Sequence, residues 1–546
     1  MSEDGIDANG VSLDGKTFVK YLGGRRKQKF TVPDGVTAIG DRAFFECSSL
    51  RSIALPDVLT SIGTRAFYRC SSLKALALPD SVTDIGAGAF SGCRDLETVV
   101  LPDGLKRIAN GAFVDCGALT TLALPEGLTT IEGNAFSRSG LETLNLPESV
   151  VDIGDGAFFE CVFLKSVVIP YGVAYIGDWT FYDCMSLDSV VIPDSVTRVG
   201  DKAFRDCRLL KSIELPASVN SIGRGAFYGC SSLQAISIPI GVSSIEEETF
   251  ACCSDLKSVL LPDGVTSIGE RAFLRCLSLT SIALPDSVTH IGFQAFLFSS
   301  LESVVIPKNV TDLGRFVFDG CSSLERIDVD GENLHFCSID GALFTKDGKT
   351  LVRYPEGRKS GRYAVPDGAT SIGEHAFDGC SHLTSVDIPN CIVEIGRGAF
   401  CECSSLKSIV IPLGVEKIES STFIECSSLQ SIVIPDNVTE IGECAFRNCS
   451  SLTSLVIPNG VTQIAFQLFA DCSSLDSIIV PSSVKEIREE AFLDCSSLKS
   501  IVITNDATEI GDGAFKGCKA LTIRARKGSS AEKYARKRRI KFEPLD

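Results

Sequence analysis

Hydrophobic and polar positions repeat along this chain with a period of 23 residues, shortened to 22 at two steps. A fixed period in this range is typical of a solenoid, in which one coil cannot bury its apolar face without its neighbours. The pattern occurs thirteen times and, after a gap, seven times more. The marker phenylalanine of the repeat stands at positions 44, 67, 90, 113, 136, 158, 181, 204, 227, 250, 273, 296 and 318, and again at 377, 400, 423, 446, 469, 492 and 515.

One repeat reads C-S-S-L-x-S-I-x-I-P-D-x-V-T-x-I-G-x-x-A-F-x-x, and its parts predict different elements. In Leu452–Pro458 the apolar Leu455 and Ile457 alternate with Ser454 and Val456, which is the period of a strand with one buried face. The proline ends this strand and begins a turn. V-T-x-I predicts a second short extended segment, and G-x-x-A-F predicts a single helical turn that carries the phenylalanine inward. Stacked coils then form a parallel sheet with strands about 4.8 Å apart.

This pattern predicts a solenoid of about 20 coils in two arrays. We expect the first array at 37–326, with 13 copies, and the second at 367–520, with 7 copies. In the insert between them, 327–366, the letters ALFTKDGKTLVRYP predict a hairpin with a D-G turn. The N-terminal LDGKTFVKYLGGRRKQKFTVPDG aligns without gaps on KDGKTLVRYPEGRKSGRYAVPDG of the insert, so residues 1–36 are expected to form a hairpin cap.

The C-terminal segment 521–546 leaves the repeat and predicts a basic cap over the last coil. We expect a last strand, a serine-capped helix from about Ser530 to Arg539, and a short strand at Ile540–Glu543. Ten Lys and Arg and one acid fall in 519–541, and they include the letters RKRR. Such a cluster is either a solvated helix face or a signal for an anionic surface or nuclear import.

Cysteine stands three residues after the marker phenylalanine in eighteen of the twenty repeats. After Phe136 and Phe296, the two exceptions, the chain is one residue shorter at the place where cysteine belongs. The position is therefore interpreted as a structural slot for a small, readily buried thiol. The predicted ladder comprises Cys47, Cys70, Cys93, Cys116, Cys161, Cys184, Cys207, Cys230, Cys253, Cys276, Cys321, Cys380, Cys403, Cys426, Cys449, Cys472, Cys495 and Cys518.

Two other chemistries for these cysteines are weighed against a ladder of free thiols. Disulfides between adjacent coils are allowed by distance, but side chains in register would form the required dihedral angle poorly. Metal binding needs ligands clustered at CxxC or CxxH spacing, which one cysteine per coil does not provide. We therefore predict an architectural ladder and no metal site.

The exposed side of the predicted strands offers a candidate binding face. Its first column is nearly always Ser or Thr, and its second column is often apolar. In the second array the second column is apolar without a break, and contiguous exposed apolar residues tend to mark contacts. The alternative is that β-branched residues simply favour strands. The candidate face comprises Ser408, Val410, Ser431, Val433, Ser454, Val456, Ser477, Ile479, Ser500 and Val502.

Composition and motifs exclude several classes of function. The chain is 44% hydrophobic with a formal net charge of -17, which argues against nucleic acid as the main partner. No window is apolar enough for a membrane helix, and the acidic N-terminus MSEDGIDANG does not resemble a secretory signal. The four histidines and scattered carboxylates match no HExxH, GxSxG or phosphate-loop pattern. We predict no enzyme and no cofactor, and we expect the lone Trp179 to serve in packing.

The repeat IPDSVTxIGxxAFxxCSSL resembles that of the BspA-like leucine-rich repeat proteins, over residues 36–326 and 367–520. These are bacterial surface proteins with relatives in protozoan parasites. The resemblance implies a leucine-rich repeat solenoid with a parallel β-sheet on one face and short strands and helical turns on the other. It also implies attachment: binding to host matrix proteins, other microbes or host cells.

The function predicted from sequence is thus non-enzymatic protein binding through the exposed sheet face, in surface adhesion or in contact with a host or other microbes. The alternative is an intracellular scaffold that holds partner proteins together. The family resemblance favours a surface or secreted location, and the absence of a signal peptide or anchor in this sequence favours a cytoplasmic one. The oligomeric state stays open.

Overall fold

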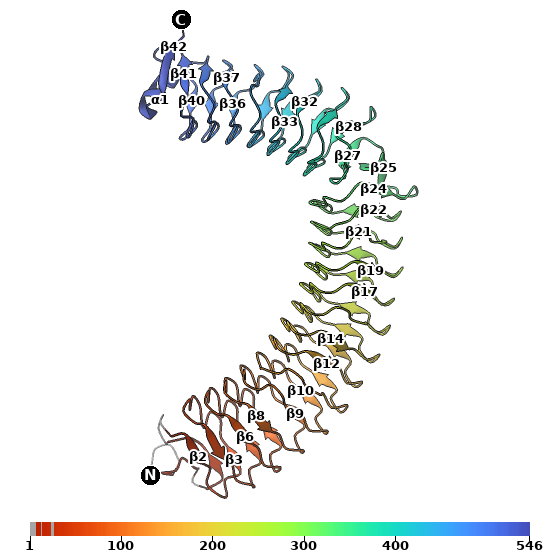
Figure 1. Ribbon diagram of the computed structural model, residues 1–546, viewed down its shortest axis with the longest axis vertical. Coiled ribbons are helices and arrows are strands. Elements are labelled where there is room, and N and C mark those ends of the chain that lie inside the picture. Colours follow the sequence, from red (N-terminus) through yellow and green to blue (C-terminus); the bar gives the residue numbers. More distant parts are fainter. Residues whose placement is uncertain (1–6, 13, 23–26, 546) are drawn as a thin grey trace. The chain divides into compact units, whose positions relative to one another are not determined.

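The computed structural model describes residues 7–12, 14–22 and 27–545, and the chain folds as two units. Unit 1 comprises Met1–Ser299 with Asp312–Val317, and unit 2 comprises Ser300–Thr311 with Phe318–Asp546. Within each unit, successive coils stack so that strands pair in parallel with the equivalent strands of the next coil (Figure 1). The predicted solenoid is confirmed, while the predicted domain boundaries stay a prediction.

Most coils carry a strand of three or four residues before the proline, and the coils also carry a two-residue strand at V-T-x-I. In unit 1 the first kind comprises β2 (Lys29–Thr31), β4 (Ser52–Ala54), β6 (Ala75–Ala77), β8 (Thr98–Val100), β12 (Ser166–Val168), β14 (Ser189–Val191), β17 (Ala235–Ser237) and β19 (Ser258–Leu260). The second kind comprises β1 (Thr17–Phe18), β3 (Ala38–Ile39), β5 (Ser61–Ile62), β7 (Asp84–Ile85), β9 (Arg107–Ile108), β10 (Thr130–Ile131), β11 (Asp152–Ile153), β13 (Tyr175–Ile176), β15 (Arg198–Val199), β16 (Ser221–Ile222), β18 (Ser244–Ile245), β20 (Ser267–Ile268), β21 (His290–Ile291) and β23 (Asp312–Leu313).

Unit 2 repeats both kinds of strand. The strands before the proline, and those that continue their sheet, are β22 (Ser303–Ile306), β24 (Arg326–Val329), β28 (Arg362–Ala364), β30 (Ser385–Asp387), β32 (Ser408–Val410), β34 (Ser431–Val433), β37 (Ser477–Val480), β39 (Ser500–Ile503), β41 (Thr522–Ala525) and β42 (Lys541–Pro544). The two-residue strands are β29 (Ser371–Ile372), β31 (Glu394–Ile395), β33 (Lys417–Ile418), β35 (Glu440–Ile441), β36 (Gln463–Ile464), β38 (Glu486–Ile487) and β40 (Glu509–Ile510).

The segment around the marker phenylalanine is not the predicted helical turn. The residues two before and two after Phe44, Arg42 and Glu46, both have left-handed backbone with φ 56°. Left-handed residues at this spacing prevent a helical hydrogen-bond ladder. Instead the amides of Arg42, Phe44 and Glu46 donate to carbonyls of the next coil, over 3.0, 2.7 and 2.7 Å. The segment is a series of turns that adds a third line of hydrogen bonds between coils.

The marker phenylalanines form the centre of the core. All twenty are buried, and their rings stack from coil to coil from Phe44 to Phe296 in unit 1 and from Phe377 to Phe515 in unit 2. The centroids of Phe158 and Phe181 lie 5.4 Å apart with an interplanar angle of 2°, and those of Phe423 and Phe446 lie 5.6 Å apart, also at 2°. Burial of one such ring contributes about 1.5–3 kcal/mol. The stacked column therefore supplies much of the free energy that holds neighbouring coils together.

The insert forms the predicted hairpin within unit 2. Strand β25 (Phe336–Ile339) pairs antiparallel with β26 (Ala342–Thr345), which pairs antiparallel with β27 (Thr350–Arg353). The D-G turn lies between β26 and β27, with Gly348 at φ 69°. Strand β27 then pairs in parallel with β29, so that the hairpin joins the stack of two-residue strands.

A buried arginine ties this hairpin to the neighbouring coils. The side chain of Arg353 is 8% exposed, and its guanidinium lies 2.9 Å from the carboxylate of Asp319 and 3.3 Å from that of Glu356. It also donates to the carbonyl oxygens of His375 and Asp378, over 2.7 and 3.1 Å. Burial raises the pKa of Glu356 to about 7, although Arg353 opposes the shift. The insert thus places a group of charged side chains in the core of unit 2.

The ends of the chain are built differently from the coils. Helix α1 (Ser530–Arg538) follows the N-cap Ser529, and β42 pairs in parallel with β41, as predicted for the C-terminal cap. Part of the predicted N-terminal hairpin lies outside the described residues, and in the described part Val11 and Phe18 form an antiparallel bridge. No helix among the described residues is long and apolar enough to cross a membrane.

Candidate functional sites on the coil surface

The strands place the candidate binding face of unit 2 in register. Strand β32 pairs with β34, which sets Ser408 beside Ser431 and Val410 beside Val433. Strand β37 pairs with β39, which sets Ser477 beside Ser500 and Ile479 beside Val502. The apolar side chains project from the sheet: Val410, Val433, Val456 and Ile479 are 60%, 58%, 80% and 62% exposed. Ser500 and Val502 are only half-exposed, which leaves four coils with a well-exposed apolar residue.

The predicted strand at Leu452–Pro458 is absent, although the burial pattern that predicted it is present. Leu455 and Ile457 are buried, and Ser454 and Val456 are exposed. The amide of Asp476 in the next coil donates to the carbonyl of Thr453 over 3.2 Å, at the edge of the segment. The central residues of this short segment form no strand pairing with the neighbouring coils, so Val456 lies on irregular backbone between β34 and β37.

The same column in unit 1 is interrupted. Val100, Val168, Val191 and Leu260 are 61%, 57%, 57% and 67% exposed, but Asn and Glu occupy the column between them. Their exposure matches that of the unit 2 residues. The two units therefore differ in the continuity of the apolar column rather than in the exposure of its members.

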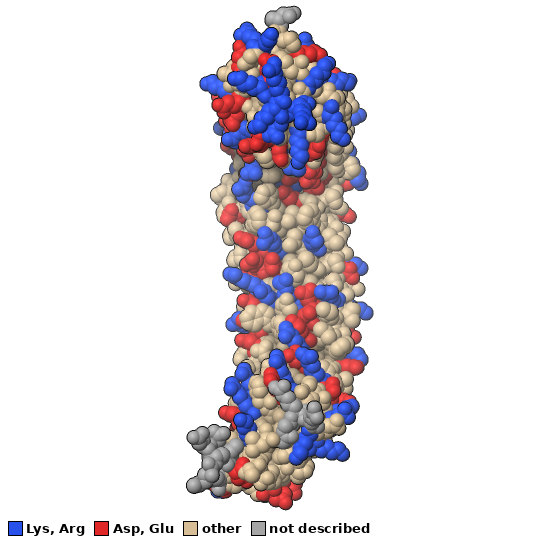
Figure 2. All heavy atoms as spheres, turned by 90° about the vertical axis from the view of Figure 1, so that its left-hand side faces the viewer, with Lys and Arg blue, Asp and Glu red and all other residues tan. Residues whose placement is uncertain are grey.

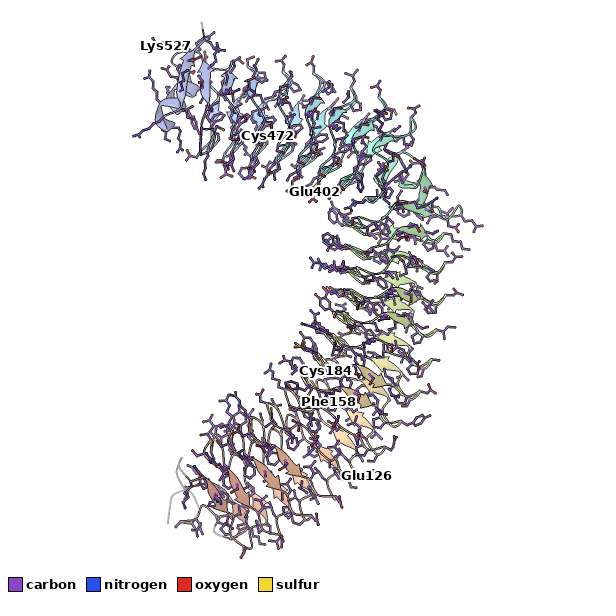
Figure 3. The ribbon with its side chains drawn as sticks, in the orientation of Figure 1. Glu126, Phe158, Cys184, Glu402, Cys472 and Lys527 are labelled. Carbon is purple, nitrogen blue, oxygen red and sulfur yellow. The ribbon has the colours of Figure 1, made fainter. Side chains whose placement is uncertain are left out.

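The cysteines three residues after each marker phenylalanine face the interior. All 23 cysteines are free thiols, and of the eighteen in the ladder only Cys47 is not fully buried. The thiol of Cys70 donates to the carbonyl of Phe44 in the preceding coil, with 3.1 Å between sulfur and oxygen. The same bond recurs from Cys184 to Phe158, two residues that Figure 3 labels in adjacent coils, and from Cys472 to Phe446. Cysteine at this spacing thus supplies a small buried group that still donates a hydrogen bond to the preceding coil.

Burial makes most of these thiols unreactive. It raises the pKa of Cys93 and Cys472 to about 12 and that of Cys161 to about 11. The thiolate is the nucleophile and the metal ligand, so a thiol with a raised pKa is inert. At the two ends of the ladder, by contrast, hydrogen bonds from Cys70 and Cys495 lower the pKa of Cys47 and Cys518.

The two repeats without cysteine keep the slot filled. Ser139 and Ser299 stand three residues after Phe136 and Phe296, and both are buried. Each amide donates to the phenylalanine carbonyl over 3.0 Å, as the cysteine amides do. The hydroxyl of Ser139 lies 3.4 Å from the sulfur of Cys161. The interpretation that a residue is missing from the slot itself was wrong: serine occupies it, and the deletion lies between it and the next leucine.

One group of three metal-ligating side chains comes together among the described residues. Atoms of Asp378, Cys401 and Glu402 that can bind a metal lie within 4.8 Å of one another, and Glu402 is exposed. The carboxylate of Asp378 also lies 2.8 Å from Nδ1 of His375. A search for CxxC spacing misses this group because its members come from successive coils. Aligning the repeats and reading the positions just after the marker phenylalanine down the column would have found it.

Lys and Arg side chains gather over the C-terminal cap of unit 2 (Figure 2). Helix α1 buries Ala531, Glu532 and Ala535, and its basic residues are exposed. Glu532, the one acid of the helix, accepts hydrogen bonds from the amide of Gly528 and from Arg536, each over 2.6 Å. The outward surface of the helix is therefore basic.

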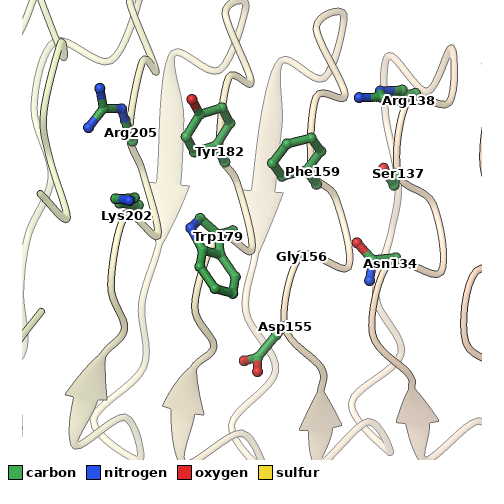
Figure 4. Close-up of a pocket in the computed structure, with 10 residues that line it drawn as sticks. All are labelled: Asn134, Ser137, Arg138, Asp155, Gly156, Phe159, Trp179, Tyr182, Lys202 and Arg205. Carbon is green, nitrogen blue, oxygen red and sulfur yellow. The ribbon is translucent and has the colours of Figure 1, made fainter. Parts of the chain in front are cut away.

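A groove crosses four coils of unit 1 on the edge that carries the phenylalanine turns (Figure 4). Its volume is about 670 Å³, and its lining includes both aromatic and polar side chains. Trp179 is 42% exposed, and its expected role in packing stays a prediction. The lining residues are Asn134, Ser137, Arg138, Asp155, Gly156, Phe159, Trp179, Tyr182, Lys202 and Arg205.

The model of the BspA type leucine rich repeat region, six copies in length, matches overlapping windows of the chain. The matched residues are 24–142, 85–211, 129–257, 199–325, 243–346, 361–473 and 416–535. The chain belongs to this BspA-type family. The family is a repeat scaffold whose members generally bind proteins.

Solved structures similar to this BspA-type chain come from several bacteria. A leucine-rich repeat protein from Eubacterium ventriosum is 23% identical, with 65% of this chain and 83% of that chain covered and a TM-score of 0.44. A leucine rich cell surface protein from Faecalibacterium prausnitzii is 23% identical, with 96% and 94% covered and a TM-score of 0.33. The pneumococcal vaccine antigen PcpA is 18% identical, with 87% and 89% covered and a TM-score of 0.38. A search of curated proteins finds no match.

Proposed function

We propose that this BspA-type protein is a non-enzymatic adhesin that binds another protein through the strand face of unit 2. The observation that supports the proposal is the column of exposed apolar side chains at Val410, Val433, Val456 and Ile479, one to a coil. Contiguous exposed apolar residues on a folded protein mark contact surfaces, and solenoids bind along such faces. The serine column beside it, from Ser408 to Ser477, supplies hydroxyls for hydrogen bonds at the rim of the contact.

The partner that fits this face is a surface protein of a host or of another microbe with its own elongated apolar strip. Stacked strands place the exposed side chains about 4.8 Å apart along the column, so the face fits an extended partner better than a compact one. Burial of four large aliphatic side chains is worth about 1.5–3 kcal/mol for each, before the cost of association.

The test compares two variants with equal numbers of changes at equivalent strand positions. In one, Val433, Val456 and Ile479 are changed to Lys; in the control, Val168, Val191 and Leu260 of unit 1 are changed to Lys. Binding to purified host matrix proteins, mucins and microbial cells is measured for both variants and for the unaltered chain.

We expect the unit 2 variant to lose binding and the unit 1 variant to keep it, with both melting near the temperature of the unaltered chain. Equal binding by both variants would remove the strand face from the proposal. Binding confined to proteins of the producing cell would replace adhesion with an intracellular scaffold.

A further inference from the structure

The groove of unit 1 owes its shape to one column of residues. Two residues before successive marker phenylalanines stand Asn134, Gly156, Trp179 and Lys202, and all four line the groove. Gly156 has no side chain, so the preceding coil places no side chain beside Trp179 at this position. In Figure 4 the indole lies in the middle of the groove, between Lys202 and Gly156.

Trp179 is a large apolar side chain at a position where most other coils have glycine or a polar residue. All twenty coils have left-handed backbone at this position, with φ 53° at Trp179, and six of them use glycine, as at Gly156 and Gly225. The backbone therefore does not require tryptophan here. The ring is 42% exposed, so it is not buried in the core. Exposed apolar side chains in a groove tend to mark contacts, and a role in binding accounts for this one.

A second pair of aromatic rings lines the groove beside the indole. Phe159 and Tyr182 stack with 4.9 Å between centroids and an interplanar angle of 12°. Stacking takes up one face of each ring, and Arg138 covers the other face of Phe159, with its guanidinium carbon 5.9 Å from the Phe159 centroid. The pair forms a fixed apolar wall, and Trp179 remains the ring available to a ligand.

The charges of the groove are largely neutralised within the protein. Arg138 makes two contacts with Glu160, of 2.7 and 3.3 Å. Arg205 lies 3.6 Å from Asp206 and 3.7 Å from Glu248. Lys202 and Asp155 add one charge of each sign. A ligand of high net charge gains little here, whereas a neutral ligand with many hydroxyl groups finds both donors and acceptors.

We propose that this groove binds an extended, neutral oligosaccharide. One sugar ring lies with its C–H face on Trp179, and Asn134, Asp155 and Lys202 bond the hydroxyls of that ring and its neighbours. The groove runs along the stacking direction across four coils, which suits a straight β-linked chain better than a helical α-linked one. This site lies outside the strand face and is independent of it.

The chain contains a single tryptophan, so intrinsic tryptophan fluorescence reports directly on the groove. The full-length chain is titrated with cellohexaose, chitohexaose and maltohexaose, and affinities are also measured by calorimetry. We expect saturable fluorescence changes with cellohexaose or chitohexaose, and at least tenfold weaker binding of maltohexaose.

The decisive variant is Trp179→Gly, which restores the residue found at this position in other coils and therefore folds. Calorimetry is expected to show at least a tenfold loss of affinity for the β-linked sugar. The matched control is Phe298→Gly, which removes another aromatic residue that is exposed (46%) and left-handed (φ 57°) in unit 1 but does not line the groove. The control variant is expected to bind as the unaltered chain does.

Three results would overturn the proposal. The first is the absence of saturable binding with all three sugars. The second is undiminished affinity in Trp179→Gly. The third is stronger binding of an acidic oligosaccharide, such as a hyaluronan hexasaccharide, than of either neutral β-linked chain.

Discussion

The core of unit 2 is built in two ways, and they solve the same packing problem differently. From Phe400 to Phe492 the interior repeats: each ring stacks nearly parallel on the next, and a buried thiol in each coil donates to a phenylalanine carbonyl. At the hairpin insert the rings of Tyr354 and Phe377 are tilted by 37°, and Arg353 with its two carboxylates fills the interior. A repeated coil packs against its neighbour through the same contacts each time, whereas the insert needs contacts of its own.

The largest effect is expected in the repeating core. Phe446→Ala removes a fully buried ring that stacks on Phe423 and Phe469, with centroids 5.6 and 5.7 Å away. We expect a loss of about 4 kcal/mol, because large cavities in a packed core collapse only in part. Urea unfolding of unit 2 followed by circular dichroism measures it. A loss below about 1 kcal/mol would show that stacking is not what holds the coils.

The next effect concerns the insert. Arg353→Met leaves Asp319 and Glu356 buried without their cation, and we expect a loss of about 3 kcal/mol. The same unfolding measurement applies. The matched control is Arg447→Met, where the side chain is 41% exposed, and its change should stay within about 0.5 kcal/mol. Equal losses of stability in Arg353→Met and Arg447→Met would mean that the buried ion pairs contribute no more than the exposed one.

A smaller effect concerns pH. The pKa of Glu356 is raised to about 7 by burial, against an ordinary value near 4.5. Between these values the unfolded chain ionises this group while the folded chain keeps it protonated, so stability falls as pH rises and then levels off above about 7. We expect the free energy of unfolding to decrease by about 2 kcal/mol from pH 5 to pH 8 through this group.

The variant Glu356→Gln isolates this contribution. Its amide oxygen still accepts from Arg353, but it does not titrate. The difference in stability between pH 5 and pH 8 should shrink in the variant relative to the unaltered chain. An unchanged pH profile would assign the dependence to the other carboxylate beside Arg353, that of Asp319, whose pKa is also raised by burial.

The smallest effect concerns the thiols. Cys449→Ala removes a buried sulfur that donates to the carbonyl of Phe423 over 3.1 Å, and we expect a loss of about 1 kcal/mol. Titration with a thiol reagent complements the measurement. Cys391 is exposed and should react first, in the folded chain, and the full count of 23 thiols should be reached only after unfolding. Rapid reaction of most thiols in the folded chain would contradict the hydrogen-bonded arrangement.

The regular parts of the molecule were predictable because the same pattern of apolar and polar residues recurs in every repeat. The spacing of the phenylalanines predicted the solenoid, and the alternation around Leu455 predicted which side chains are buried. The turns around Phe44 were not predictable from hydrophobic pattern, since left-handed backbone there accepts Arg and Glu as well as Gly. The groove at Trp179 and the group at Asp378 and Cys401 depend on columns across coils, which a reading along the chain does not follow.

The hydrogen bond from each ladder thiol to the preceding coil has a consequence for how the gene can change in length. Each coil offers the same carbonyl to its successor and the same thiol to its predecessor, so whole coils are interchangeable at their junctions. Unequal recombination between repeats of the gene can then remove or duplicate a coil without any compensating substitution. Alleles that differ by whole coils would present the same end structures with a longer or shorter surface between them.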